Sequence, residues 1–134
     1  MGQPAAKQGD QVVAVDTHIV MVPAAAPAPP VPTLLPHPFA GVIGGGLSTD
    51  VKIMGKAAAV VGSTADNTPP HRPTAPGTTF QKPPSDKATI QKGSQTVNIN
   101  GKPAARAGDK ALTCNDPADQ PSGTVVAVGT VSIG

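Results

Sequence analysis

The sequence predicts one small all-β domain, residues 1–134, built from a short unit that occurs three times. Three observations lead to this prediction. Val and Ile alternate with other residues in short runs, a pattern typical of half-buried strands. A block of small residues recurs along the chain. No stretch has the apolar spacing of an amphipathic helix, and no polar linker separates two cores.

The recurring block is clearest at residues 2–10 and 101–109. The two copies, Gly-Gln-Pro-Ala-Ala-Lys-Gln-Gly-Asp and Gly-Lys-Pro-Ala-Ala-Arg-Ala-Gly-Asp, are identical at six of nine positions. A weaker copy lies at residues 55–63, where Gly62-Ser63 replaces the Gly-Asp pair. Glycine permits positive φ and proline cannot donate a ladder hydrogen bond, so each block is expected to contain tight turns.

A short strand is predicted immediately before each block. Residues 51–54 and 97–100 both read Val-x-Ile-x ahead of the glycine. The first block lacks such a strand, but the chain ends in Val-Ser-Ile-Gly. We therefore expect a C-terminal strand, residues 130–134, to lie beside the first block and complete it. The three predicted units lie near residues 2–10, 51–63 and 97–109.

Outside the repeats, strands are predicted at residues 12–15, 19–22 and 125–128. Two insertions, residues 23–50 and 64–92, separate the copies unevenly. Seven prolines between Pro23 and Pro38 predict a polyproline-like loop on the side of the domain. Recognition of this segment by an aromatic-lined groove of another protein is the alternative interpretation. Residues 64–92 are expected to form a second, polar loop.

The composition excludes several classes of protein. A net charge of +2 and the lack of Tyr and Trp argue against nucleic-acid binding. A single cysteine excludes an internal disulfide, and the N-terminus has no segment of secretory type. The 15 Gly and 17 Pro leave a disordered, proline-rich adaptor protein as an alternative. The β-branched runs and the low charge, 13% of residues, favour a folded domain.

Residues 93–109 carry a resemblance to a known family. The segment Thr-Val-Asn-Ile-Asn followed by Gly-Lys-Pro-Ala-Ala-Arg-Ala-Gly-Asp resembles the signature of PAAR-repeat proteins. The ending Gly-Thr-Val-Ser-Ile-Gly is also similar to theirs. The resemblance extends from Gly2 to Gly134, although the uneven spacing and Gly62-Ser63 depart from the family pattern.

The resemblance implies a fold and a function. It implies a small three-sided β cone of three pseudo-repeats with long proline-rich loops. Such a cone would cap and sharpen the trimeric β-helical spike (VgrG-like) of a type VI secretion system or an extracellular phage-tail-like particle, one tip per trimer. Transient contact with a target membrane, effector cargo, and assembly in the bacterial cytoplasm before delivery at the particle tip are implied as well.

The resemblance also implies a metal, usually zinc, near the apex, and iron is the alternative metal. The candidate ligands are His18, His37, His71 and Cys114. Three of these four follow a Gly-Asp-like corner of a repeat, so threefold folding would carry them toward one axis. Three imidazoles and a thiolate suit a closed tetrahedral zinc site. His37 lies in the proline-rich insertion, and Asp16 or Asp116 is an alternative fourth ligand.

An enzymatic role is not predicted. A hydrolytic zinc site keeps one position open for water, whereas four protein ligands leave none. No carboxylate has a recognisable spacing for a general base, and no histidine signature accompanies Cys114. A small metalloenzyme is therefore the least favoured of the three interpretations.

Overall fold

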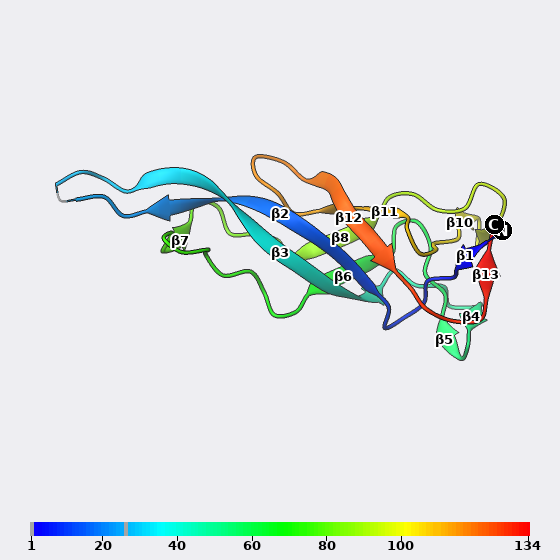
Figure 1. Cartoon of the computed structure of the whole chain (residues 1–134). Helices are drawn as coiled ribbons and strands as arrows, with labels where there is room; N and C mark the ends of the chain where they lie inside the picture. The colour runs from blue at the N-terminus through cyan, green and yellow to red at the C-terminus, as the bar shows by residue number, and fades with distance from the viewer. Residues whose placement is uncertain (1, 26) are drawn as a thin grey trace.

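The computed structural model describes residues 2–25 and 27–134 of an elongated molecule (Figure 1). Every regular element within those residues is a β-strand, which confirms the predicted all-β class. The strands also form a closed sheet that is compatible with a small β cone. No helix in the described part of the chain is long and apolar enough to cross a membrane.

One sheet forms most of the body. Its strand order is β12-β11-β8-β6-β3-β2-β7, and an additional pairing of β12 with β2 closes six of the strands into a ring. The strands are β2 (Gln11–Val22), β3 (Val31–Gly45), β6 (Thr64–Asn67), β7 (Thr79–Phe80), β8 (Lys87–Ile90), β11 (Lys110–Thr113) and β12 (Gln120–Val126). The main core lies inside this ring and includes Val12, Phe39, Ile43, Ile90 and Val125.

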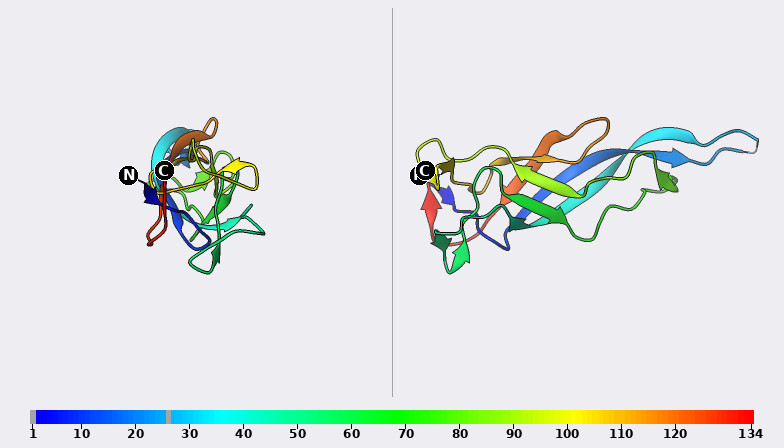
Figure 2. Two further views of the ribbon diagram at one scale, coloured as in Figure 1. Left: turned by 90° about the vertical axis from the view of Figure 1, so that its right-hand side faces the viewer. Right: turned by 180° about the vertical axis from the view of Figure 1, so that it is seen from behind.

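Three short antiparallel strand pairs form one end of the molecule, which we call the base (Figures 1 and 2). Two are hairpins, and the third, which we count with them as a base hairpin, pairs strands from the two ends of the chain. They pair β4 (Lys52–Ile53) with β5 (Lys56–Ala57), β9 (Asn98–Ile99) with β10 (Lys102–Pro103), and β13 (Ser132–Ile133) with β1 (Gln3–Pro4). The registers match: Ile53 lies opposite Lys56, Ile99 opposite Lys102, and Ile133 opposite Gln3. The strand beside the first block thus comes from the other end of the chain. The three isoleucines share a second core cluster.

The turns of two base hairpins have the same backbone geometry. Met54 and Gly55 have φ of 52° and 82°, and Asn100 and Gly101 have φ of 53° and 78°. Positive φ at both central residues of a two-residue loop is the feature of a type I′ turn. In the third unit no turn joins β13 to β1, and the two ends of the chain lie side by side at the position of the turn (Figure 1).

A ring of backbone hydrogen bonds joins the three units. The amide of Ala6 donates to the carbonyl of Ala105, Ala105 donates to Ala59, and Ala59 donates to Ala6, at 2.9–3.0 Å. All three side chains are fully buried. Each unit therefore contacts the other two around a pseudo-threefold axis. This crowding explains the second alanine of each repeated Ala-Ala pair, because a larger side chain there would press against the equivalent residues of the other two units.

Each block ends in a corner that is closed by the same hydrogen bond. The amides of Lys7 and Arg106 donate to the carboxylates of Asp10 and Asp109 at 3.0 and 2.8 Å. In the middle copy the amide of Val60 donates to the hydroxyl of Ser63 at 3.0 Å, and that hydroxyl donates to the carbonyl of Gly46 at 2.9 Å. A carboxylate could not donate this second bond, so the serine suits the middle corner.

The two insertions contain more regular secondary structure than the sequence predicted. The segments predicted as two strands, residues 12–15 and 19–22, form the single strand β2. The proline-rich loop prediction is wrong for residues 31–38, which belong to β3; residues 31–42 of that strand pair with β2 at twelve positions. Within residues 64–92, the short strands β6, β7 and β8 replace ten residues of the expected loop. Proline fits β3 because the nitrogens of the proline positions face away from β2.

The alanine ring predicts that Ala105→Val destabilises the fold. Adding two methyl groups at a fully buried position beside two equivalent alanines forces the units apart, so we expect a loss of about 1–3 kcal/mol in unfolding free energy. Chemical denaturation would measure this loss. The matched control is Ala118→Val at an exposed position. Equal stabilities of the two variants would contradict the crowding argument.

Candidate metal centre

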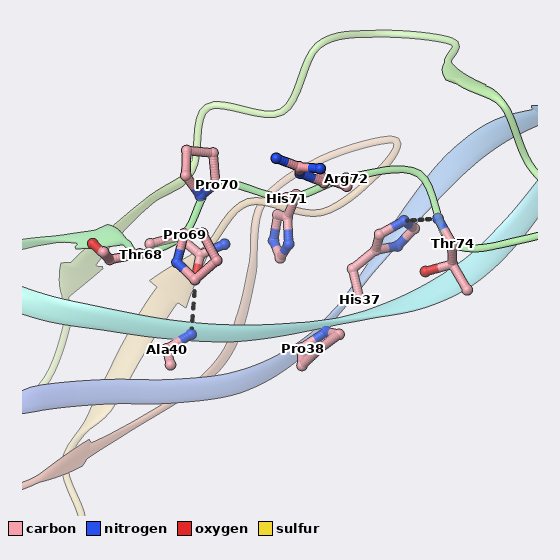
Figure 3. A pocket seen from close by; sticks show the side chains of 10 residues that line it. His37, Pro38, Ala40, Thr68, Pro69, Pro70, His71, Arg72 and Thr74 are labelled. Carbon is pink, nitrogen blue, oxygen red and sulfur yellow. Dashed lines mark hydrogen bonds between the residues drawn. The ribbon is translucent and has the colours of Figure 1, made fainter.

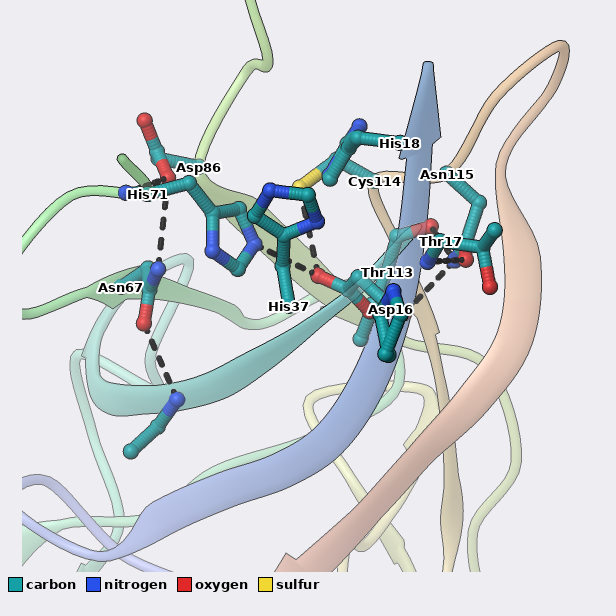
Figure 4. Close-up of polar contacts among 12 residues, drawn as sticks. Asp16, Thr17, His18, His37, Asn67, His71, Asp86, Thr113, Cys114 and Asn115 are labelled. Atoms are coloured by element: carbon teal, nitrogen blue, oxygen red, sulfur yellow. Dashed lines mark hydrogen bonds and ion pairs between the residues drawn. The ribbon is translucent and has the colours of Figure 1, made fainter. Parts of the chain in front are cut away.

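Four ionisable side chains meet inside the molecule (Figure 4). They are Asp16 and His18 from β2, His71 from the segment between β6 and β7, and Cys114 directly after β11. One candidate ligand atom from each residue lies within 4.8 Å of those of the others. The side chains are nearly fully buried: the exposed fractions are 0% for Asp16, 1% for His18 and 3% for Cys114, and the His71 side chain is 2% exposed although the whole residue is only partly buried. The arrangement is therefore a compact, buried set of metal-binding atoms.

The strand geometry places these residues together. Successive side chains of a strand point to opposite faces, so Asp16 and His18 share the inward face of β2. The ring-shaped sheet brings the end of β11 to the same interior, where Asp116 accepts a hydrogen bond from the amide of Ile19 at 2.8 Å. His71 is positioned through its amide, which donates to the carboxylate of Asp86 at 2.8 Å.

The carboxylate of Asp16 lies at the centre of the cluster. Its Oδ2 is 3.0 Å from Nε2 of His71 and accepts a 3.4 Å hydrogen bond from the thiol of Cys114. The other oxygen, Oδ1, is buried without a hydrogen-bond partner, as is Nε2 of His18. Buried polar atoms without partners are costly, and a cation bound by this carboxylate and Nε2 of His18 would lower that cost.

A second layer of contacts orients the histidines. Nδ1 of His18 lies 3.4 Å from Oδ2 of Asp116. A proton on this nitrogen would be shared with the carboxylate, leaving the lone pair of Nε2 for a metal. Metal-binding histidines commonly have such a carboxylate or carbonyl partner on the nitrogen that does not bind the ion. Asp116 thus supports the cluster from outside.

His37 lies next to the cluster. Its ring centroid is 5.4 Å from that of His18 and 5.6 Å from that of His71. Both ring nitrogens have hydrogen bonds: Nδ1 donates to the carbonyl of Leu35 at 2.9 Å, and Nε2 accepts from the amide of Thr74 at 3.1 Å. Asp16, which the sequence analysis gave as an alternative fourth ligand, supplies the fourth candidate ligand atom of the cluster. The role of His37 as a ligand stays a prediction.

A surface hollow of about 360 Å³ adjoins the cluster (Figure 3). His37 and His71 line it together with Arg72 and the paired prolines Pro69 and Pro70. The hollow lies between β3 and the segment that follows β6. It therefore borders the cluster at His71, with His37 beside it.

Burial shifts the pKa of two of these groups. Desolvation lowers the pKa of His37, and the neighbouring His18 adds to that effect, although the hydrogen bond to Leu35 opposes it. Desolvation also raises the pKa of the Cys114 thiol to about 11, and the negative charge of Asp16 adds to this rise. Without a metal, the thiol is therefore protonated at neutral pH.

The donor set fits a divalent transition metal. Imidazole nitrogen, thiolate sulfur and carboxylate oxygen are the ligands of zinc in proteins, and structural zinc sites have four of them in a tetrahedron. The orphaned Nε2 of His18 is an atom that such an ion would satisfy, and Oδ2 of Asp16 lies beside His71 and Cys114 as a further ligand atom. The cluster can therefore hold a metal ion compatible with zinc.

Comparison with known protein families gives one match, the PAAR motif. The match covers residues 35–118 and again residues 80–133, which together span more than half of the chain. The second match contains the third repeated block, and the first contains the middle block together with His37, His71 and Cys114. A comparison with curated proteins found no match to the chain.

The raised pKa of Cys114 predicts that metal capture depends on pH. Binding requires the thiolate, so the proton must leave the thiol when the ion arrives. Below the thiol pKa, affinity should rise about tenfold per pH unit for each proton released. Titration of the metal-free protein with cobalt(II) between pH 6 and 8, followed by thiolate-to-cobalt absorption, would measure this slope.

Cys114→Ser is the control for that titration. The thiolate-to-cobalt band should disappear in this variant, and the part of the pH dependence due to the thiol should disappear with it. An affinity of the unmodified protein that stays constant across this pH range would show that Cys114 does not bind the ion.

Proposed function

The chain belongs to the PAAR motif family, and on that premise we propose that it caps the trimeric spike of a contractile injection machine as a metal-stabilised tip. The family is one of structural spike tips. The finer parts of the proposal are that one chain caps one trimer, that zinc stabilises the tip, and that the tip aids puncture of a membrane.

The pseudo-threefold base is the observation that carries this proposal. The three base hairpins have matching registers, and the ring of Ala6, Ala59 and Ala105 relates them around one axis. A single chain with three equivalent faces can match three identical chains, which is how the symmetry of an assembly constrains its interfaces. Capping would also cover strand ends of the spike that otherwise invite incorrect pairing.

Zinc is the metal that the cluster suits best. In our proposal His18, His71 and Cys114 hold the ion, with Asp16 as the fourth ligand. A bound zinc would cross-link β2, the loop after β6 and the end of β11, three segments distant in sequence. In a domain with few large apolar side chains, the binding free energy of the metal becomes folding free energy.

We propose no catalytic role for this centre. Four protein ligands close a tetrahedral site, and a hydrolytic zinc needs an open position for water. The cluster is also almost fully buried. The proposed activity is mechanical: assembly on the spike in the bacterial cytoplasm, departure with the particle, and entry into the target membrane, with effector cargo as an additional partner.

Elemental analysis of the purified protein should find close to one zinc per chain, and Cys114→Ser should lose most of it. Because the site substitutes for core packing, this substitution should lower the melting temperature by about 10 °C or more. Calorimetry with and without chelator would measure the shift. Ser122→Ala, at an exposed position of β12, is the control. Metal-free folded protein, or equal melting temperatures, would refute a structural zinc site.

The fourth ligand can be identified separately. His37→Ala and Asp16→Asn should differ in zinc content, and we expect the smaller loss for His37→Ala because both of its ring nitrogens already have partners. X-ray absorption of the zinc protein would count the bound imidazoles. Two imidazoles would assign the fourth position to Asp16, whereas three would assign it to His37.

Mixing the protein with its trimeric spike should give a complex of one tip and three spike chains. Native mass spectrometry would measure this stoichiometry directly. Deletion of residues 130–134 removes β13 and one of the three base faces, so it should abolish capping. A complex of three tips and three spike chains, or binding along the shaft with the end left open, would contradict the proposal.

A further inference from the structure

The β2–β3 hairpin presents no charge to solvent. The sequence contains no Lys, Arg, Asp or Glu from residue 17 to residue 49. Within the hairpin, residues 11–45, the ionisable side chains are Asp16, His18 and His37, and each is at most 1% exposed. The hairpin also forms the end of the molecule opposite the base (Figures 1 and 2). The hairpin that forms the leading end of the proposed tip is therefore uncharged, and the exposed Lys82 lies beside β2, next to Gln81, whose amide donates to the carbonyl of Ile19.

The outward face of this hairpin is mostly apolar. Side chains alternate along both strands, so odd positions of β2 and even positions of β3 face outward. Val15 and Leu34 on this face are 64% and 56% exposed. Of the twelve outward positions in the paired region, only Gln11 and Thr17 are polar.

The other side of the closed sheet is charged. Asp66 on β6, Lys87 on β8 and Lys110 on β11 are exposed there, and Lys87 pairs with Asp66 at 2.8 Å. The sheet thus has one charged side and one uncharged side, formed by β2 and β3 with Val126 of β12 beside them. This difference in charge lies in surface residues, so packing of the core does not account for it.

Few backbone N–H groups are left unpaired along the hairpin edges. The amide of Ala40 points away from β2, since it donates to Asn67, and the period of two gives the same direction to residues 32, 34, 36 and 38. Three of these four are proline and have no N–H to expose. Along the β2 edge, the carbonyls of Ile19 and Met21 accept amides from the segment around β7.

These features suit entry into hydrocarbon. A charge at the centre of a bilayer and an unsatisfied backbone donor are both energetically costly there. The hairpin has no exposed charge, and proline leaves few unpaired N–H groups on the outer edge of β3. Its twelve residue pairs, from Gln11↔Val42 to Val22↔Val31, extend over about 40 Å, compared with about 30 Å for the hydrocarbon layer. The uncharged face is therefore long enough to reach through that layer.

We propose that the β2–β3 hairpin is the lipid-contacting element of the tip, and that its outward face packs against acyl chains when the tip enters a bilayer. The proposal rests on the proposed function in that the base must face the spike for the hairpin to lead. A protein partner is less suited to this face, which lacks the Trp, Tyr and Arg that dominate protein interfaces.

The test uses a single tryptophan, because the chain has none. Leu34→Trp places this probe on the outward face, and Gln91→Trp, at another exposed position outside the hairpin, is the matched control. The zinc-loaded proteins are mixed with phosphatidylcholine vesicles, with or without bromine on the acyl chains. We expect a blue shift and loss of fluorescence for Leu34→Trp with brominated lipid, and neither change for Gln91→Trp.

A charged variant gives a second measurement. Leu34→Lys should weaken co-sedimentation with the same vesicles by about 100-fold, given the cost of a lysine in hydrocarbon, whereas Gln91→Lys should not. If Leu34→Trp keeps its fluorescence with brominated lipid, or if Leu34→Lys binds as the unmodified protein does, the lipid proposal is wrong.

The capping assay with the spike trimer distinguishes failure of the lipid proposal from failure of the proposed function. Leu34→Lys should still form the complex of one tip and three spike chains, because the base is unchanged. Lipid contact without capping would overturn the function as a spike tip and leave the hairpin result standing. Capping without lipid contact would overturn only the present proposal.

Discussion

The ring of hydrogen bonds among Ala6, Ala59 and Ala105 is the constraint on which the rest of this structure depends. It holds three units so close to one axis that only small side chains fit, and the repeated blocks are accordingly rich in Ala and Gly. Small side chains bury little apolar surface, so the domain needs stabilisation from elsewhere. The closed sheet supplies part of it, and in our proposal a metal held by the buried cluster around Asp16 would add a cross-link at a distance from the axis.

Local patterns in the sequence were sufficient for the repeat and for the all-β class, because strand alternation and turn glycines are short-range signals. They were misleading for β3. Proline is usually excluded from strands, but Pro32, Pro36 and Pro38 recur with a period of two on an edge that faces away from β2. Their even spacing was a signal of an edge strand, and the number of prolines concealed it.

The candidate centre was predictable to a similar degree. His18, His71 and Cys114 follow repeat corners, and they lie together in the structure. The position of Asp16 at the middle of the cluster depends on which face of β2 points inward, and the hydrogen bonds of His37 depend on the register of β3 and on Thr74. These are long-range features, since the register of a pair of strands is set by the turn and the core rather than by either residue alone.

The matching of the three base hairpins leaves the orientation of the tip about its pseudo-threefold axis undetermined. Backbone geometry gives the base three nearly equal ways to sit on a threefold partner, 120° apart, and the β2–β3 hairpin has no counterpart in the other two units. Across a population of particles the hairpin would then occupy three azimuths. An image reconstruction averaged with threefold symmetry would show a sharp base, whereas the hairpin would be smeared to about one third of its true density.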